Sequence, residues 1–316
     1  MNFKIKDVEN NEYDVSNVLS YEINKSVYIP CDSLNISFLN PVITTEIKEI
    51  YAYNNGDIIF KGVVDKQICS FNKKGLISSI SARNTAALLV DNESVPGTYI
   101  LPNTKSIFFN HCEKFGFKNK LPDFFLDGEY IVPKGISNWG AISNFIRGIS
   151  GEKIYVNNND EICIFEPSKN IAVINEKNDI ISAKLIYNRS QPVSKIKYKI
   201  GDNNYIFTAE NKELIKKDIL RSRSINISSF PLWKQKDIIK NIFRSSIKNY
   251  NFLEICLAGS VNFNLYDSVD FSHNRLGSFD NQCIKEIAYI FDKNGEKTEL
   301  VLSEDRQIKE EFYVDK

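Results

Sequence analysis

The stretch from Gly56 to Tyr99 restricts the fold more than any other part of this 316-residue chain. Apolar residues over 58–64 lead to the polar segment 72–75, and apolar residues return over 76–80. Two such runs joined by a short loop that contains glycine predict a β-hairpin. Polar residues over 81–85 and a turn-rich segment up to Gly97 follow this hairpin, and none of these residues indicates catalysis.

More strands are expected on the N-terminal side of this hairpin. Leu34, Ile36 and Phe38 alternate with polar residues, which is the period of two of a half-buried strand. Tight turns separate similar runs, and Asn54–Asp57 is a strong turn signal. About six strands before residue 97 predict a small antiparallel barrel or sandwich. The expected strands cover 3–5, 13–15, 21–29, 34–39, 47–53 and the two arms of the hairpin.

The composition changes after residue 96, and helices are expected there. A first helix is predicted from Thr104 to Phe115, with Asn103 or Thr104 as its cap and Gly116 as its stop. A second is predicted over 139–150 with Asn138 as its N-cap, since apolar residues recur there at helical spacing. With strands over 153–156 and 161–165, residues 97–171 are expected to form an α/β lobe.

The rest of the chain returns to alternating patterns, interrupted by helix-prone sequence. The order of elements is a β-set, the lobe, two strands, a helical insert and four more strands, so the fold class is α+β and mainly β. No repeat is visible in residue identity between the two β-sets. Strands are predicted over 179–187, 193–200, 252–257, 268–271, 282–290 and 297–302, helices over 209–220 and 232–249, and a polar arm over 304–316.

Composition and charge exclude several classes of protein. The chain has 40 Lys and Arg against 40 Asp and Glu, whereas a duplex DNA binder usually has a basic excess or a basic face, so no specific nucleic-acid binding is expected. No run of eighteen apolar residues occurs, so no membrane span is expected. The first residues lack the apolar core of a signal peptide, and folding is expected in the cytoplasm of the cell that makes the protein.

Residues with metal or nucleophile chemistry are few and scattered. The six cysteines form no C-x-x-C pair, which predicts free, buried thiols in a reducing compartment. His111 and Cys112 are neighbours, but no second pair of ligands lies near them in the sequence, so no metal site is predicted. His273 is the other histidine. The phosphate-binding, dinucleotide-binding, zinc-protease and nucleophile-elbow motifs do not occur. We therefore expect no cofactor, no metal and no catalytic residue.

Four other groups of residues have both a structural and a functional interpretation. Asp123, Asp127 and Glu129 come closest to a glycosidase carboxylate pair, but a solvated loop is the favoured interpretation. The basic segment Arg221–Arg223 is assigned to surface ion pairs. Core packing is favoured for the tryptophans and for the aromatic-rich stretch over base stacking. These aromatic residues are Phe108, Phe109, Phe115, Phe117, Phe124, Phe125, Tyr130, Trp139 and Trp233.

Three parts of the chain, in order, carry a resemblance to a known family. The first is GDIIFKGVVD followed by VPGTY; the second is SIFFNHCEKFGF with NWGAISNFIRGISGEKIYVNNNDEICIF; the third is LAGSVNFNLYDSVDF with IKEIAYIFDKNGEKTELVLSED. Together they resemble the baseplate hub proteins of contractile-tailed phages and phage-tail-like bacteriocins, the tail hub or late control protein D-like superfamily. Two positions depart from the pattern: Tyr266 replaces the usual glycine before Asp267, and Tyr289 stands where histidine is common.

The resemblance implies a specific architecture. Such hubs are homotrimers with two tube-like antiparallel β-barrels in each chain, so three chains present six barrels to a six-fold tail tube. The first barrel would be residues 1–96. The second would be residues 172–303, interrupted by the helical insert 203–252. The lobe 97–171 and the insert would pack outside the ring, and residues 304–316 would form a polar arm.

The resemblance also implies the function of a structural adaptor without catalysis. The implied partners are the tail tube protein, the tail spike protein, and the baseplate wedge and tape-measure proteins. The implied location is the tail baseplate of a virion or of a bacteriocin-like particle, assembled in the bacterial host cytoplasm. Three alternatives stay open: a tail-associated cell-wall hydrolase, a receptor-binding or spike protein, and the hub of a type VI-like secretion spike. The hydrolase requires a catalytic constellation and the spike protein requires fibrous repeats, neither of which the sequence shows.

Overall fold

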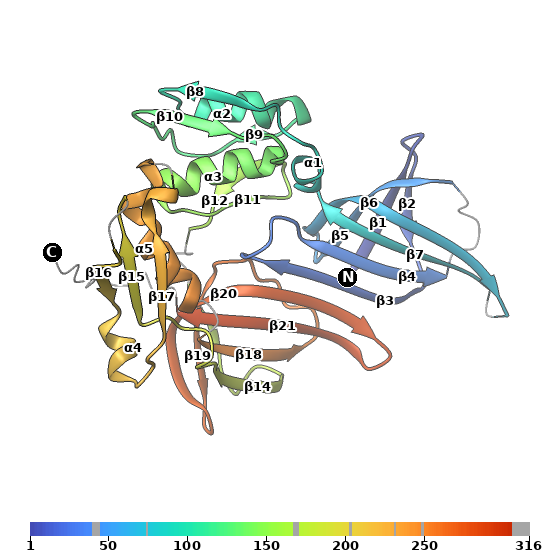
Figure 1. The fold of residues 1–316 in the computed structure, drawn as a ribbon. Helices are drawn as coiled ribbons and strands as arrows, with labels where there is room; N and C mark the ends of the chain where they lie inside the picture. Colours follow the sequence, from blue (N-terminus) through green and yellow to red (C-terminus); the bar gives the residue numbers. More distant parts are fainter. Residues whose placement is uncertain are drawn as a thin grey trace.

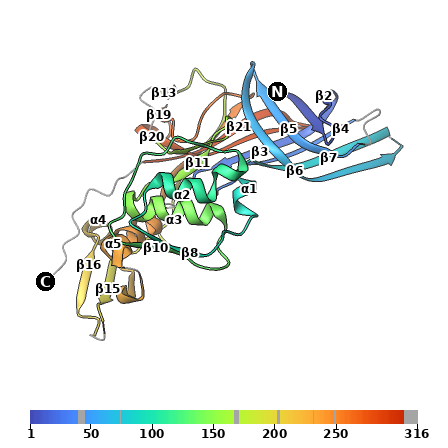
Figure 2. The ribbon, with the colours of Figure 1, turned by 90° about the horizontal axis from the view of Figure 1, so that it is seen from above.

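A computed structural model describes residues 1–39, 45–73, 75–166, 171–201, 204–230, 232–247 and 250–304. The chain is mainly β, and thirteen of its described strands belong to one sheet (Figure 1), while the others form three small sheets. A lobe that contains α2 and α3 lies above this sheet, and a smaller unit with α4 and α5 lies beside the lobe. The two views agree on this arrangement (Figures 1 and 2).

Seven strands form the first β-set, in the order β3-β4-β7-β6-β5-β1-β2. Buried and more exposed residues alternate along β4, as its sequence pattern predicts, and Leu34, Ile36 and Phe38 lie in the core. The predicted hairpin forms as β6 and β7, with Asn72 opposite Gly75. The bounds are β1 Asn2–Asp7, β2 Glu12–Val15, β3 Val18–Ser26, β4 Ser33–Leu39, β5 Ile47–Asn54, β6 Asp57–Asn72 and β7 Gly75–Asn84.

Six strands form the second β-set, in which β14-β18-β21-β20 are consecutive neighbours and β19 and β13 continue from β20. All pairings in this set are antiparallel except β13 with β19. The predicted C-terminal hairpin forms as β20 and β21, with Asp292 opposite Gly295. The bounds are β13 Ile171–Ile174, β14 Ile180–Tyr187, β18 Asn251–Ala258, β19 Ser268–His273, β20 Gly277–Asp292 and β21 Gly295–Glu304.

The prediction of two separate β-barrels is not met by the strand pairing. Strand β3 pairs with β20, so both β-sets belong to one 13-stranded sheet. Within the described residues no pairing closes either set on itself. A single buried cluster runs through both sets, from Phe3 and Ile23 to Leu257 and Tyr289. Edge strands carry unpaired backbone groups, and the pairing of β3 with β20 satisfies those groups where the two sets meet.

The lobe contains the two predicted helices. Helix α2 begins after Asn103, whose side chain accepts a hydrogen bond from the Ser106 N–H, as expected for its cap. Helix α3 begins at Asn138, but its N-cap is Ser137, one residue before the predicted one. Strands β8 and β10 were not predicted. The bounds are α1 Ala87–Val90, β8 Gly97–Ile100, α2 Thr104–His111, η1 Glu113–Phe115, β9 Lys118–Asn119, β10 Glu129–Val132, α3 Asn138–Ser150, β11 Ile154–Val156 and β12 Glu161–Ile164.

The smaller unit differs most from the prediction. The strand predicted over 193–200 forms as β15, but it pairs with β16 and β17 in a separate sheet and not with the second β-set. The helix predicted over 209–220 is only the short α4, preceded by β16. Buried Ile196, Ala209 and Phe243 join this sheet to α5 in one cluster. The bounds are β16 Phe207–Glu210, β15 Lys195–Lys199, α4 Lys212–Lys216, β17 Ser222–Asn226, η2 Ile227–Ser229 and α5 Leu232–Ile247.

Some predictions fall on residues outside the described part. The predicted arm 304–316 lies outside it except for Glu304, and so do residues 248–249 at the end of the predicted long helix. Lys74 in the predicted hairpin turn and the side chain of Trp233 also lie outside it. The domain boundaries at 96, 171 and 303 stay predictions.

Candidate assembly interface

The joint between the two β-sets is the pairing of β3 with β20. Residues 21–26 of β3 run antiparallel to residues 286–291 of β20, with Ile23 opposite Tyr289. Both of these side chains are fully buried. The Tyr289 hydroxyl accepts a hydrogen bond from the Phe263 N–H at 3.2 Å and donates one to the Phe263 carbonyl at 3.1 Å. Burial raises the pKa of Tyr289 to about 12, so this hydroxyl stays protonated.

The two β-sets contain matching hairpins, which residue identity does not reveal. Strands β6 and β20 each have 16 residues, and β7 and β21 each have 10. The register shift lies between Val64 and Lys66 in one hairpin and between Ile284 and Glu286 in the other. A shift of 220 in residue number, from Asp57 to Gly277, therefore superimposes the pairing of one hairpin on that of the other. Such shifts are β-bulges, which bend and twist a hairpin.

The strands beside these hairpins match as well. Strand β4 pairs with β7 as β18 pairs with β21, so Leu34 corresponds to Leu253. Strand β3 pairs with β4 as β14 pairs with β18. The register of β3 shifts between Val18 and Ser20, and that of β14 shifts at the corresponding place, between Ile180 and Ser182. The order β3-β4-β7-β6-β5 is thus repeated as β14-β18-β21-β20-β19.

The two sets differ in what lies at their edges. Residues 286–291 of β20 are paired with β3 on one side and β21 on the other. The corresponding residues 66–71 of β6 pair with β7, and within the described part of the chain no strand pairs with their other side. Phe71 is 85% exposed and Ile68 is 48% exposed. In contrast, Ile287 and Tyr289 in the matching half of β20 are buried.

Strand β14 also lacks a partner strand that its counterpart in the other set has. It corresponds to β3, but β18 is its only partner among the described strands. Ala183 and Leu185 occupy the positions of the buried Tyr21 and Ile23, yet both are only partly buried against the core. Tyr187 is 59% exposed. Figure 1 shows β14 near the lower end of the sheet and the tip of the β6–β7 hairpin at its far right, so these two edges lie at different ends of the molecule.

The β11–β12 hairpin of the lobe, together with Phe165 directly after it, contacts both β-sets. On the first set, Asp160 forms an ion pair with Lys61 and accepts a hydrogen bond from the Thr85 hydroxyl at 2.8 Å. On the second set, the ring of Phe165 stacks on Tyr266 with 5.0 Å between centroids. The lobe therefore braces the β3–β20 joint from one side of the sheet.

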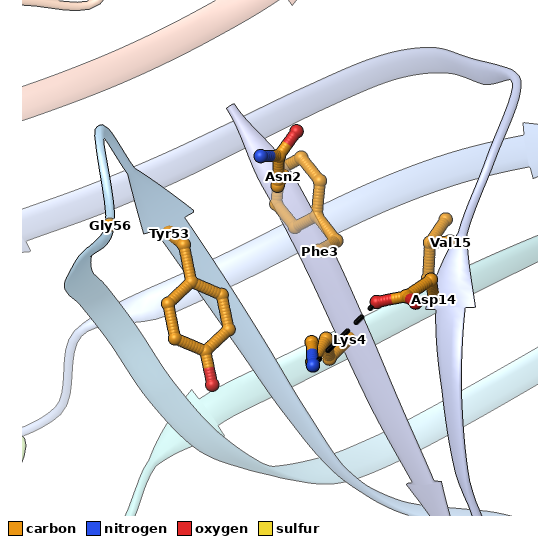
Figure 3. A pocket seen from close by; sticks show the side chains of 7 residues that line it. All are labelled: Asn2, Phe3, Lys4, Asp14, Val15, Tyr53 and Gly56. Carbon is orange, nitrogen blue, oxygen red and sulfur yellow. Dashed lines mark ion pairs between the residues drawn. The ribbon is translucent and has the colours of Figure 1, made fainter.

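A pocket of about 470 Å³ lies at the β2 end of the first set (Figure 3). Phe3 and Lys4 come from β1, Asp14 from β2 and Tyr53 from β5, and Gly56 lies at the adjoining turn. Lys4 and Asp14 face one another across it at 3.8 Å, and both side chains are well exposed. The lining contains no histidine or cysteine, and one exposed ion pair does not make an acid–base site.

A smaller pocket of about 190 Å³ lies between the first β-set and the lobe. The Asp160–Lys61 ion pair lies in its wall together with apolar residues of the lobe. Lys61 neutralises Asp160, and Glu49, the other carboxylate of the lining, accepts a hydrogen bond from the Tyr51 hydroxyl. Both carboxylates are therefore held by contacts at the junction of the lobe and the sheet.

His111 and Asp123, which the sequence analysis considered as candidate metal-binding or catalytic residues, form structural contacts. His111 is buried between the Tyr99 hydroxyl at 3.0 Å and the Asn138 side chain at 3.2 Å, and burial lowers its pKa. Asp123 forms an ion pair with the Lys105 ammonium at 3.0 Å on the surface. Within the described residues, no group of three or more His, Cys, Asp or Glu side chains is placed to hold a metal ion.

The aromatic stretch divides between the core and the surface. Phe108, Phe117 and Tyr130 lie in the core of the lobe, as predicted, whereas Phe109 and Phe125 are exposed. The six cysteines form no disulfide. Cys112 and Cys283 are buried, as predicted, whereas Cys69 is exposed on the edge strand β6. None of the helices in the described part of the chain has the length and apolar character required to cross a bilayer.

The exposed edges of β6 and β14 were missed by the sequence analysis. The available signal was the segment 68–71, in which apolar Ile68 and Phe71 point to opposite faces of one strand near a hairpin tip. Apolar residues on both faces of a strand require partners on both faces, and a hairpin tip in a monomer lacks them.

Comparison with solved structures places this architecture among phage tail proteins. The tail protein from Neisseria meningitidis MC58 matches with a TM-score of 0.78 and 15% identity, covering 96% of this chain and 96% of that chain. The 43 kDa tail protein of prophage MuSo2 from Shewanella oneidensis matches with a TM-score of 0.79, 15% identity and the same coverage. An E. coli component of the type VI secretion system, which exhibits structural similarity to the T4 bacteriophage tail proteins gp27 and gp5, matches with a TM-score of 0.57 and 7% identity, covering 92% of this chain and 74% of that chain.

No protein-family model and no curated protein sequence matches the chain. At these low identities the structural likeness shows the fold. The chain has the fold of phage tail proteins, and the resemblance to tail hub proteins is confirmed at that level.

Proposed function

We propose that this protein is a structural hub of a tail baseplate, which forms a homotrimeric ring between a six-fold tail tube and a three-fold spike. The observation that carries the proposal is the fold, which matches two phage tail proteins over 96% of both chains. The repeated β-set supports it, because two similar units in each of three chains give six similar positions around a ring. The tail tube, spike, wedge and tape-measure proteins are the partners of this hub.

The overall charge is compatible with a channel wall. The formal net charge is zero, so the ring as a whole does not attract the DNA that passes through a tail. The exposed edges on β6 and β14 require partners, because unpaired strand edges in a monomer promote unwanted association. The proposed location is the baseplate of a virion or a bacteriocin-like particle, assembled in the host cytoplasm.

We propose no catalytic activity for the chain. A cell-wall hydrolase would require a carboxylate pair or a nucleophile with a base. Two carboxylates line the smaller pocket, but Asp160 is ion-paired with Lys61 and Glu49 accepts a hydrogen bond from the Tyr51 hydroxyl. The larger pocket has Asp14 as its single carboxylate. A zymogram on purified cell walls tests this directly, and clearing that is lost on substitution of one acidic residue would favour the hydrolase. The hub of a type VI-like spike is the other candidate, favoured by the likeness to the E. coli type VI component.

The native mass of the purified chain tests the ring. We expect the mass of three chains, either for the chain alone or only when the neighbouring spike protein is present. A monomer in both preparations would contradict the trimeric hub. Electron microscopy of the trimer with tail tube protein then tests the adaptor role, since a ring of six similar units seated on the end of the tube is expected.

A further inference from the structure

We infer that β14 of one chain pairs with residues 66–71 of β6 in a second copy of the chain, in the register of the β3–β20 joint. This inference deepens the proposed ring and rests on it. The exposed edge of β6 in each chain would therefore pair with the exposed edge of β14 in the next chain.

The argument starts from the internal repeat. Within one chain, β20 binds β3 along residues 286–291. Strand β6 is the counterpart of β20 in the first set, and β14 is the counterpart of β3 in the second. The two strands that lack a described partner on one side, β6 and β14, are thus the counterparts of the two strands that pair in the β3–β20 joint. Strands with the same bulge and the same neighbours present their backbone groups in the same geometry, so the joint can be made a second time between chains.

The repeat also determines the register. In the joint, Tyr289 lies opposite Ile23 and Phe291 lies opposite Tyr21. Cys69 corresponds to Tyr289, and Leu185 corresponds to Ile23. Transferring the pairing places Cys69 of one chain opposite Leu185 of the next, Phe71 opposite Ala183, and Ile68 opposite Ile186.

This register brings apolar groups together on both faces of the sheet. Phe71, now 85% exposed, would pack beside the partly buried Ala183, where the joint has Phe291 beside the buried Tyr21. Ile68 would meet Ile186 on the opposite face. A shift of one residue would place the polar Ser70 opposite Leu185 and would turn Phe71 away from the core face that Ala183 and Leu185 share. Burial of Phe71 and Ile68 supplies a driving force that a polar edge would lack.

The contact is head-to-tail, because the two edges differ and each chain has one of each. Contacts of this kind generate either closed rings or open filaments. Each copy adds one joint within the chain and one between chains, and both joints have the same strand register. A ring closed in this way leaves neither edge exposed.

Disulfide trapping tests the register with the protein's own exposed Cys69. Directly opposed residues in an antiparallel pair have Cα separations within the range that a disulfide allows. We expect the Leu185→Cys chain, under mild oxidation and with the spike protein if the trimer requires it, to shift from a one-chain band to two- and three-chain bands. Reductant should reverse the shift, and Cys69→Ser in the same background should abolish it.

Lys184→Cys is the matched control. Its side chain points to the opposite face of β14, so the proposed register predicts no cross-link to Cys69, and the wild-type chain measures background from the other cysteines. Should Leu185→Cys misfold, Phe71→Cys with Ala183→Cys in a Cys69→Ser background tests the same register at an adjacent pair.

The outcomes separate the two proposals. A three-chain native mass without cross-linking of either cysteine pair would overturn this inference and leave the ring standing. Cross-linking of Lys184→Cys in place of Leu185→Cys would overturn the register. A chain that is monomeric alone and with the spike protein would overturn the ring itself.

Discussion

The ring of Tyr266 stacks on Phe165 with 5.0 Å between centroids and 18° between planes, while the Tyr266 backbone has a φ of +69°. A left-handed backbone is unfavourable for a bulky side chain and natural for glycine. Phe165 in turn stacks on Tyr155, and the Lys285 ammonium lies 4.1 Å from the centroid of the Tyr266 ring. The contact between lobe and sheet thus offsets a strained backbone at Tyr266.

This strain predicts an unusual order of stability among substitutions of Tyr266. Tyr266→Ala loses the stack and keeps the left-handed backbone, so we expect a loss of about 1–3 kcal/mol in the free energy of unfolding. Tyr266→Gly also loses the stack but relieves the backbone, and it should be more stable than the alanine variant by about 1 kcal/mol. Chemical denaturation measures both, with Tyr266→Phe as the control that keeps the ring. An alanine variant as stable as the glycine variant would argue against strain.

Gly62 is required for a steric reason. A Cβ atom at this position would lie 2.5 Å from the Phe60 ring and would collide with the Arg83 carbonyl oxygen. We expect Gly62→Ala to lower the free energy of unfolding by about 1–3 kcal/mol, because the core next to β6 must shift. Gly97→Ala is the matched control, since a Cβ there meets no atom within 4 Å, and its thermal midpoint should stay near that of the wild type. Equal midpoints for the two variants would show that the core relaxes without cost.

The Tyr289 hydroxyl should stabilise the loop that precedes β19. It bonds both backbone groups of Phe263, so Tyr289→Phe leaves an N–H and a carbonyl without this partner. We expect a loss of about 1–3 kcal/mol in the free energy of unfolding. Hydrogen exchange of the Phe263 amide should also become faster. The control is Tyr53→Phe, whose hydroxyl forms no hydrogen bond to a described residue in the structure; comparable losses in both variants would contradict the role of this hydroxyl.

Asp32 should make stability depend on pH. Burial raises its pKa to about 6, against the opposing effects of the Lys25 cation and a hydrogen bond from Asn84. A carboxyl with a raised folded-state pKa is more easily protonated in the folded protein, so its ionisation lowers stability as pH rises from about 4 to 6. Asp32→Asn should remove this decline and stabilise the chain above pH 6, by at most about 3 kcal/mol.

Denaturation at several pH values measures this effect. The difference between Asp32→Asn and the wild type should be small near pH 4 and largest above pH 6. A difference that does not change with pH would show that the Asp32 carboxyl titrates normally in the folded chain.

Local sequence determined most strands and the helices of the lobe. Alternation in β4 and the glycine-containing turns of the two hairpins identify strands without reference to the rest of the chain, because these signals act between residues close in sequence. Helices α2 and α3 follow from capping residues and apolar spacing for the same reason. The short strands β8 and β10 pair with each other although α2 lies between them in the sequence, so no tight turn marks them as a hairpin.

Only the tertiary structure decided how the strands combine. The pairing of β3 with β20 joins residues more than 250 positions apart, and nothing local in either strand selects the other. The same holds for β15, whose alternation matches that of a strand in the large sheet but whose partners are β16 and β17. The internal repeat is also tertiary, because it consists of matching registers and bulges formed by different side chains. Strands pair through backbone hydrogen bonds, which do not depend on side-chain identity. The missing partners of β6 and β14 are therefore recognisable only from the tertiary structure, in which their counterparts β20 and β3 pair with each other.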